Sequence, residues 1–123
     1  MIIDAESKEA IIAALIGREL NDIKYKSVSD WFAYLTNLVS TCKIPEKTIA
    51  KIGEVKATRD ILVHNAGVVN QTYLNKSGQF SRAAVGEYIS ITADYTLECW
   101  QLLSSTLIEI LDLLIGVYNK DEE

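Results

Sequence analysis

Residues that bind metals are scarce in this chain. It has one histidine, His64, and two cysteines, Cys42 and Cys99, which stand far apart and form no CxxC pair. A structural zinc site needs four clustered ligands, so no metal site is expected, and no cofactor-binding motif is present. Both cysteines fall in helical patterns, and we expect buried free thiols, as in a reducing cytosol.

Long uncharged hydrophobic runs are also missing. The most apolar stretch, 102–117, carries Glu109 and Asp112, which argues against a membrane span. The chain does not start with a basic and apolar signal peptide. We therefore expect a soluble cytoplasmic protein with no membrane partner.

Basic residues are too few to balance the acidic ones. The chain has 12 Lys and Arg against 17 Asp and Glu, which gives a net charge of −5. A general nucleic-acid coat protein would be basic, so any polyanion must be met by a local patch. With 123 residues, 49% of them hydrophobic, the whole chain 1–123 suits a single domain with a core of its own.

Helical periodicity and capping signals divide the chain into four main helices. Asp4 can cap the first helix, Ser27 and Asp30 form a capping box for the second, and the only proline, Pro45, suits the start of the third. Residues 85–91 alternate as an extended segment does, and Thr92 can start the last helix. The expected spans are 5–24, 28 to about Cys42, about 46 to Leu74, and 93–118. The predicted fold class is all-α, a bundle of four to five helices with one short extended segment before the last.

The third predicted helix carries polar residues in unusual places. At about 100° per residue, three lines run along it. A broad apolar face contains Arg59 near its middle and consists of Ile52, Val55, Leu62, Ala66, Val69 and Tyr73. A second apolar stripe lies on roughly the opposite side and consists of Ala50, Ala57, Ile61 and Val68. A third line, which mixes polar residues with glycine, consists of Gly53, Asp60, His64, Gly67 and Gln71.

Two interpretations of this helix stay open. A lone histidine is more often an ordinary core or surface residue, and Arg59 could extend its stem over apolar neighbours to reach solvent. The alternative is a site in which Asp60 and His64, four residues apart, are neighbours that can hydrogen-bond. On an ideal helix Arg59 and His64 diverge by about 140°, so a shared site would need helix distortion or contact across a dimer axis.

The segment Arg59-Asp60-Ile61-Leu62-Val63-His64 resembles the signature of the HEPN superfamily. That signature is an arginine, usually followed by a polar residue, then a histidine after four to six positions; here the gap is four. The similarity extends through "KATRDILVHNAGVVNQTYLNKSG", "GEYISIT" and the long apolar helix, from about residue 46 to 118. The first two helices match the family only in general character.

The resemblance implies a helical bundle that dimerises across its motif helices. Many members are metal-independent endoribonucleases of toxin–antitoxin or antiviral-defence systems, and others are inactive binding modules. Carried over, Arg59 and His64 would be catalytic and Asp60 and Asn65 supporting. Further assignments are RNA-binding residues Lys56, Gln71 and Tyr73, and dimer-interface residues Gly53 and Gly67, at which a second backbone could approach closely.

The residue chemistry agrees with cleavage of RNA. Metal-free cleavage activates the ribose 2′-OH, stabilises a phosphorane-like transition state and protonates the leaving 5′ oxygen. An imidazole can serve as base or acid near neutral pH, and a guanidinium suits charge on phosphate oxygens. Because base and acid are two roles and the chain has one histidine, a homodimer would supply both.

Two functions therefore stand side by side. The first is a dimeric HEPN endoribonuclease acting on RNA, with an antitoxin or a larger defence protein as a further partner. The second is an inactive HEPN domain that binds a nucleotide or a protein, favoured by the acidic composition.

Overall fold

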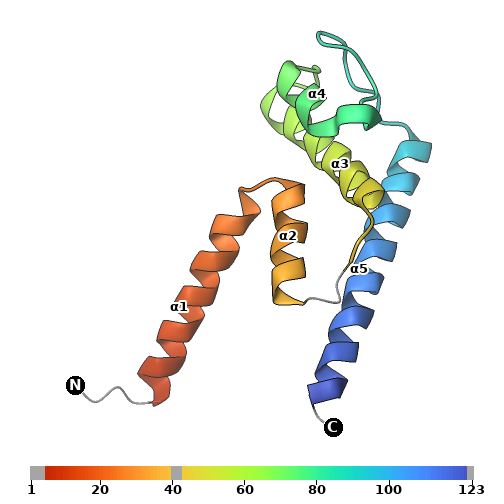
Figure 1. Ribbon diagram of the computed structural model, residues 1–123. Helices are drawn as coiled ribbons and strands as arrows, with labels where there is room; N and C mark the ends of the chain where they lie inside the picture. Colours follow the sequence, from red (N-terminus) through yellow and green to blue (C-terminus); the bar gives the residue numbers. More distant parts are fainter. Residues whose placement is uncertain (1–4, 40–42, 122–123) are drawn as a thin grey trace.

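The computed structural model describes residues 5–39 and 43–121, and it is all-α (Figure 1). Five α-helices and one short 3₁₀ helix follow each other, and the described residues contain no strand. The predicted all-α fold class is confirmed. The elements are α1 (Ala5–Lys24), α2 (Val28–Leu38), α3 (Glu46–His64), α4 (Gln71–Ser77), η1 (Gly78–Phe80) and α5 (Ala93–Asp121).

The start of α2 is fixed by the predicted capping box. The Ser27 hydroxyl accepts from the Asp30 amide at 3.2 Å, and the Asp30 carboxylate accepts from the Ser27 amide at 3.3 Å. The helix ends at Leu38, before the expected Cys42, because the backbone of Val39 is extended. Cys42 and the first predicted cap, Asp4, lie outside the described residues.

The largest departure from the sequence prediction is at the third helix. One helix to Leu74 is wrong: α3 ends at His64, and the chain turns through Ala66 and Gly67, whose φ angles are 54° and 78°. The amides of Asn65 and Gly67 both donate to the carbonyl of Ile61, at 2.9 Å each, which closes the helix end. Asn70 then caps α4 by accepting from the Tyr73 amide at 2.8 Å. The chain folds back, so α4 lies beside α3 (Figure 1).

This break also changes the faces predicted for the third helix. Arg59 and Leu62 were placed on a buried face, but both are exposed. Ile52 of α3 is buried as predicted, whereas Val69 and Tyr73 reach the core from beyond the turn rather than from the same helix. A continuous line from Gly53 to Gln71 therefore does not exist.

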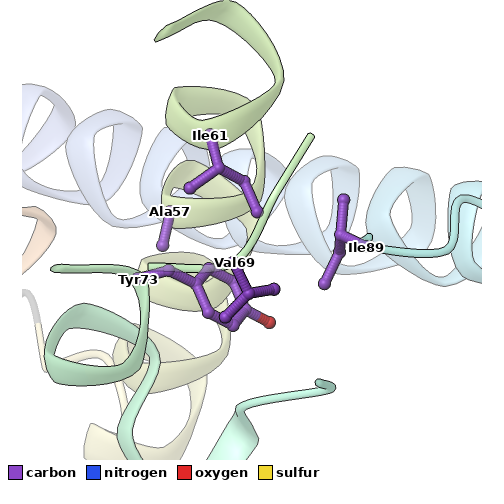
Figure 2. Packing of buried hydrophobic residues seen from close by; sticks show 5 residues of the cluster. All are labelled: Ala57, Ile61, Val69, Tyr73 and Ile89. Atoms are coloured by element: carbon purple, nitrogen blue, oxygen red, sulfur yellow. The ribbon is translucent and has the colours of Figure 1, made fainter. Parts of the chain in front are cut away.

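Two hydrophobic clusters hold the bundle together. One joins α2, α3 and one side of α5 around Phe32 and Ile52. The other lies under the turn after α3, where Val69 and Tyr73 pack on α3 and Ile89 closes the far side (Figure 2). This second cluster holds the end of α3, and hence His64, against α4. Its buried members are Ala57, Ile61, Val69, Tyr73 and Ile89.

The segment before the last helix is extended only in part. Val85 and Gly86 form a turn, and Tyr88 makes an isolated antiparallel bridge with Val68. The Thr92 hydroxyl accepts from the Tyr95 amide at 3.0 Å and so starts α5 as predicted.

The last helix, α5, is long and poorly covered. By length and composition alone, Ala93–Asn119 could cross a membrane, with only 6% of its most apolar window buried in the chain. Cys99, on its inner side, is a free thiol and is half-buried.

Candidate functional site

A cleft of about 900 Å³ lies between the α1–α2 turn, the second half of α3, and α4. It contains both residues of the HEPN-like motif, Arg59 and His64. Of the described residues that line it, four are Lys or Arg and one, Asp60, is acidic, although the chain as a whole has a net charge of −5. A local basic patch of the kind that an acidic protein needs for a polyanion is therefore present. Its cations are Lys24, Lys56, Arg59 and Lys76.

Asp60 gathers three of these cations around one carboxylate. Its Oδ1 accepts from Arg59 at 3.0 Å, and its Oδ2 accepts from Lys56 at 3.1 Å and from Lys76 at 3.5 Å. Burial alone would raise the pKa of the Asp60 carboxyl, but these cations outweigh that effect and lower the pKa below its usual 3.8. Asp60 thus neutralises one positive charge and holds the others within reach of a single anionic group.

The same ion pair explains how Arg59 and His64 come to border one cleft. The Arg59 side chain is 64% exposed, and its guanidinium bends over the neighbouring Asp60. Asp60 lies between Arg59 and His64 around the helix axis, at about 100° from Arg59. Arg59 and His64 therefore line the same cleft within one chain and on one continuous helix, although they diverge by about 140° around its axis.

His64 is the last residue of α3, and its side chain is exposed. No hydrogen bond to its imidazole occurs within residues 5–39 and 43–121, so both ring nitrogens are open to a ligand in the cleft. The next residue, Asn65, donates from Nδ2 to the Val68 carbonyl at 2.7 Å and so fixes the turn. Asn65 supports the position of His64 through the backbone.

The three predicted RNA-binding residues have different environments. Lys56 lines the cleft, with its Nζ 5.8 Å from the Trp31 ring centre. Tyr73 forms part of the wall but is 1% exposed, and its hydroxyl donates to Glu54 and accepts from the Arg82 amide. Gln71 does not line the cleft and donates to Asn75 on α4. Lys56 is the member of this group that presents charge to a ligand.

Of Gly53 and Gly67, both predicted at a dimer interface, Gly67 has a clear role inside the chain. A Cβ at Gly53 would lie 3.4 Å from the Lys76 carbonyl oxygen of α4, which is an ordinary van der Waals contact. Gly67 is buried and has a positive φ, which suits the turn after α3. The turn therefore accounts for Gly67, and a dimer interface at the two glycines stays a prediction.

Sequence reasoning missed several residues of the cleft wall. Lys76 reaches Asp60 only because the chain folds back after Gly67. Lys24, the last residue of α1, and Tyr25, in the turn that follows, also line the cleft. Trp31 is held there by a hydrogen bond from its indole nitrogen to the Ile23 carbonyl. The available signal was Asn65-Ala66-Gly67 itself, since asparagine and glycine commonly end helices.

A second polar cluster, also missed, centres on Glu54, which is 4% exposed. Its Oε1 accepts from Thr58 at 2.7 Å, from Arg82 at 2.8 Å and from Tyr73 at 2.9 Å, and its Oε2 accepts from Tyr95 at 2.8 Å. The Arg82 guanidinium also stacks on the Tyr95 ring, 3.5 Å from its centre. The Glu54 cluster therefore ties α3, α4, the loop before α5, and α5 together.

The Glu54 cluster is internally satisfied. Burial alone would raise the pKa of the Glu54 carboxyl, but the hydrogen bonds from Arg82, Thr58 and the two tyrosines lower it below the usual 4.5. Burial raises the pKa of the Tyr95 hydroxyl, and the Glu54 charge adds to that effect. Both oxygens of the Glu54 carboxylate already accept hydrogen bonds from other side chains. We therefore assign the Glu54 cluster to stabilising the fold rather than to binding a substrate.

No group of three or more His, Cys, Asp or Glu side chains that could hold a metal occurs in the described part of the chain. In comparisons with known proteins, no family model, curated protein or solved structure matches this chain.

Proposed function

We propose that this chain is a HEPN-type endoribonuclease that cleaves RNA without a metal ion at the cleft of Arg59 and His64. The observation that carries the proposal is the cleft itself. It brings the two motif residues together with three lysines in a chain of net charge −5. An exposed imidazole beside clustered cations is the combination that phosphodiester cleavage needs.

In the proposed reaction, His64 removes the proton from a ribose 2′-OH, and the 2′ oxygen attacks the adjacent phosphorus. The bond to the 5′ oxygen breaks, and that oxygen must receive a proton. Arg59 offers a planar pair of donors to the phosphate oxygens, on which negative charge grows in the transition state. Lys56 and Lys76 add charge nearby, and Asp60 keeps all three cations in place.

The proton for the leaving oxygen requires a second group. The chain has one histidine, so we propose that His64 of a second copy fills this role in a homodimer. The family resemblance further implies a cytoplasmic toxin or antiviral-defence setting, with an antitoxin or a larger defence protein as a partner.

A specific observation favours the second candidate, an inactive HEPN domain that binds a nucleotide. Asp60 already pairs with three cations, and Tyr25 and Trp31 give the cleft aromatic walls on which a base could stack. Such a site could hold a nucleotide phosphate and base without reaction.

The test uses RNA and DNA of one sequence, incubated with the purified wild-type chain in excess EDTA. Cleavage of RNA alone, leaving 2′,3′-cyclic phosphate and 5′-hydroxyl ends, is the expected result, because DNA lacks the attacking 2′-OH. Binding of a nucleotide without cleavage of either polymer would favour the second candidate. Cleavage that stops in EDTA would contradict the metal-independent mechanism.

A further inference from the structure

A second pocket opens beside the cleft of Arg59 and His64. It lies between the start of α2, the first half of α3 and the end of α4, and its volume is about 470 Å³. That volume falls within the range of about 300–1,000 Å³ that is usual for small-ligand sites. We call it the side pocket, and its lining includes Tyr25, Lys26, Lys56, Asn75, Lys76 and Gln79.

The side pocket and the cleft border each other. Three residues, Tyr25, Lys56 and Lys76, line both of them. On the cleft side, the ammonium groups of Lys56 and Lys76 lie 3.1 Å and 3.5 Å from the Asp60 carboxylate. A chain molecule that leaves the cleft can therefore enter the side pocket, and it passes two cations on the way.

The charge of the side pocket has one sign. Three lysines and no acidic side chain are found among the described residues that line it, in a chain of net charge −5. The nearby Asp30 does not line the pocket, and its carboxylate accepts from the Ser27 amide in the cap of α2. Two other pockets of the chain each contain glutamate beside their cations. The side pocket thus continues the positive charge of the cleft rather than sharing the mixed charge of the remaining surface.

The side pocket also contains groups that can recognise a base. Tyr25, at the border with the cleft, is 78% exposed, and the Nζ of Lys24 lies 5.0 Å from its ring centre. An exposed aromatic ring of this kind can stack on an unpaired base. Asn75 and Gln79 bring side-chain amides, which can donate to and accept from the edge of a base. A cation for phosphate, a ring and two amides are thus present in one place.

We propose that the side pocket binds one more nucleotide of a single-stranded RNA, adjoining the two that the scissile phosphodiester joins. This inference rests on the proposed function, because the cleft then holds the phosphodiester itself. Lys26 pairs with the phosphate of the added nucleotide, and Tyr25 stacks on its base. A base inside a duplex is already stacked and paired, so the side pocket selects an unpaired strand.

Binding of 2′-O-methyl RNA in EDTA, followed by fluorescence anisotropy, tests the side pocket without cleavage. The methyl group blocks the attacking 2′ oxygen, so the wild-type chain can be used unchanged. A dinucleotide spans the cleft only, whereas a hexanucleotide also reaches the side pocket. The wild type should bind the hexanucleotide about tenfold more tightly or better, because an added base stacks and an added phosphate is paired.

Lys26→Glu should remove most of that advantage. We expect about tenfold weaker binding of the hexanucleotide and little change for the dinucleotide, with a salt dependence of log Kd that falls by about 0.7 in slope. The matched control is Lys47→Glu, which makes the same charge change at an exposed position of α3 that lines neither pocket and should bind both lengths as the wild type does. The variant should fold, because Lys26 is exposed and its amide, which donates to the Ile23 carbonyl at 3.0 Å, is kept.

Four results would overturn the proposal. They are equal binding of the two lengths by the wild type, equal losses in Lys26→Glu and Lys47→Glu, equal affinity for a blunt duplex, and equally strong competition by a hexaglutamate peptide. The last result would mean that the side pocket binds acidic chains by charge alone. A failure of the proposed function is distinguishable, because unmodified RNA would stay intact while the length dependence and the Lys26→Glu effect on binding persisted.

Discussion

Arg59 does not have the environment that its neighbours in sequence suggest. The periodicity predicted a buried position, but the side chain is 64% exposed and pairs with Asp60. The reason is that a buried guanidinium without a full set of acceptors is costly, whereas Asp60 offers one at the surface. The spacing of Arg59 and His64 could be read from the sequence. The ion pair between Arg59 and Asp60, which holds the guanidinium at the surface, could not.

Arg59→Ala should therefore separate activity from stability. We expect loss of RNA cleavage with a change in unfolding free energy within about 0.5 kcal/mol, as for other surface substitutions. Arg59→Lys should not restore cleavage, because an ammonium group lacks the planar pair of donors. Cleavage rates at equal folded fraction, with urea unfolding of each variant, provide the check. A fully active lysine variant would show that Arg59 acts only through its charge.

The lowered pKa of Glu54 predicts how the stability of the fold depends on pH. Its folded-state pKa is lowered, so the charged cluster stabilises the fold above the usual pKa of 4.5 and loses that contribution as the pH falls. Glu54→Gln should cost about 3 kcal/mol at pH 7, because it leaves Arg82 without its charge partner. It should also flatten the acid dependence of stability.

Melting temperatures of wild type and Glu54→Gln between pH 3.5 and 7, roughly the range in which carboxylates titrate, measure this effect. The difference between the two proteins should shrink toward acid. An equal loss of stability in both proteins would mean that Glu54 is not responsible.

At the level of elements, capping signals predicted boundaries better than apolar periodicity did. Ser27 with Asp30, and Thr92, each start a helix as the sequence indicated. The third helix was misread because Ala66, Val69 and Tyr73 happen to fit a helical repeat with Ile52. The apolar pattern records burial, and both sides of the turn are buried in one cluster. Since Lys76 joins the cleft only through that turn, it could not be placed from the sequence.

The turn after α3 should be sensitive to a single methyl group. Gly67→Ala should lower stability by about 1–2 kcal/mol, because alanine is strained at a φ of 78°. Ala66→Gly is the matched control, since its φ of 54° already strains alanine and glycine relieves it. We expect this control to be neutral or mildly stabilising in thermal unfolding. Destabilisation by both changes, to the same extent, would argue against the positive φ at Gly67 as the cause.

At the scale of the whole molecule, two features agree with the proposed homodimer. The proposed reaction has two proton transfers, and the chain has one histidine. The accessible surface of 9064 Å² is also larger than that of a compact monomer of the same mass, about 6,600 Å². The all-α class and the single apolar last helix were predictable, because both follow from composition and period. The exposure of the apolar side chains on α1 and α5 could not be predicted. An apolar row has the same sequence pattern whether it packs inside the chain or against another molecule.

A mixing experiment tests whether one reaction uses two copies. Wild type and His64→Ala are refolded together in equal amounts, so that about a quarter of the dimers contain two histidines. If each reaction needs both, activity should fall to about one quarter of that of the same total amount of wild type. A fall to about one half would mean that each copy works alone. The His64→Ala homodimer, prepared separately, supplies the background.

The most direct measurement of the proposed function is the rate of RNA cleavage in EDTA by the wild type and by His64→Ala. The imidazole is exposed and makes no hydrogen bond within the described residues, so its removal should leave the helical circular dichroism and the melting temperature nearly unchanged. We expect the wild type to cleave and the folded variant to be inactive, a loss of at least about a hundredfold for a general acid or base. Equal cleavage by both proteins, or none by either, would contradict a catalytic His64.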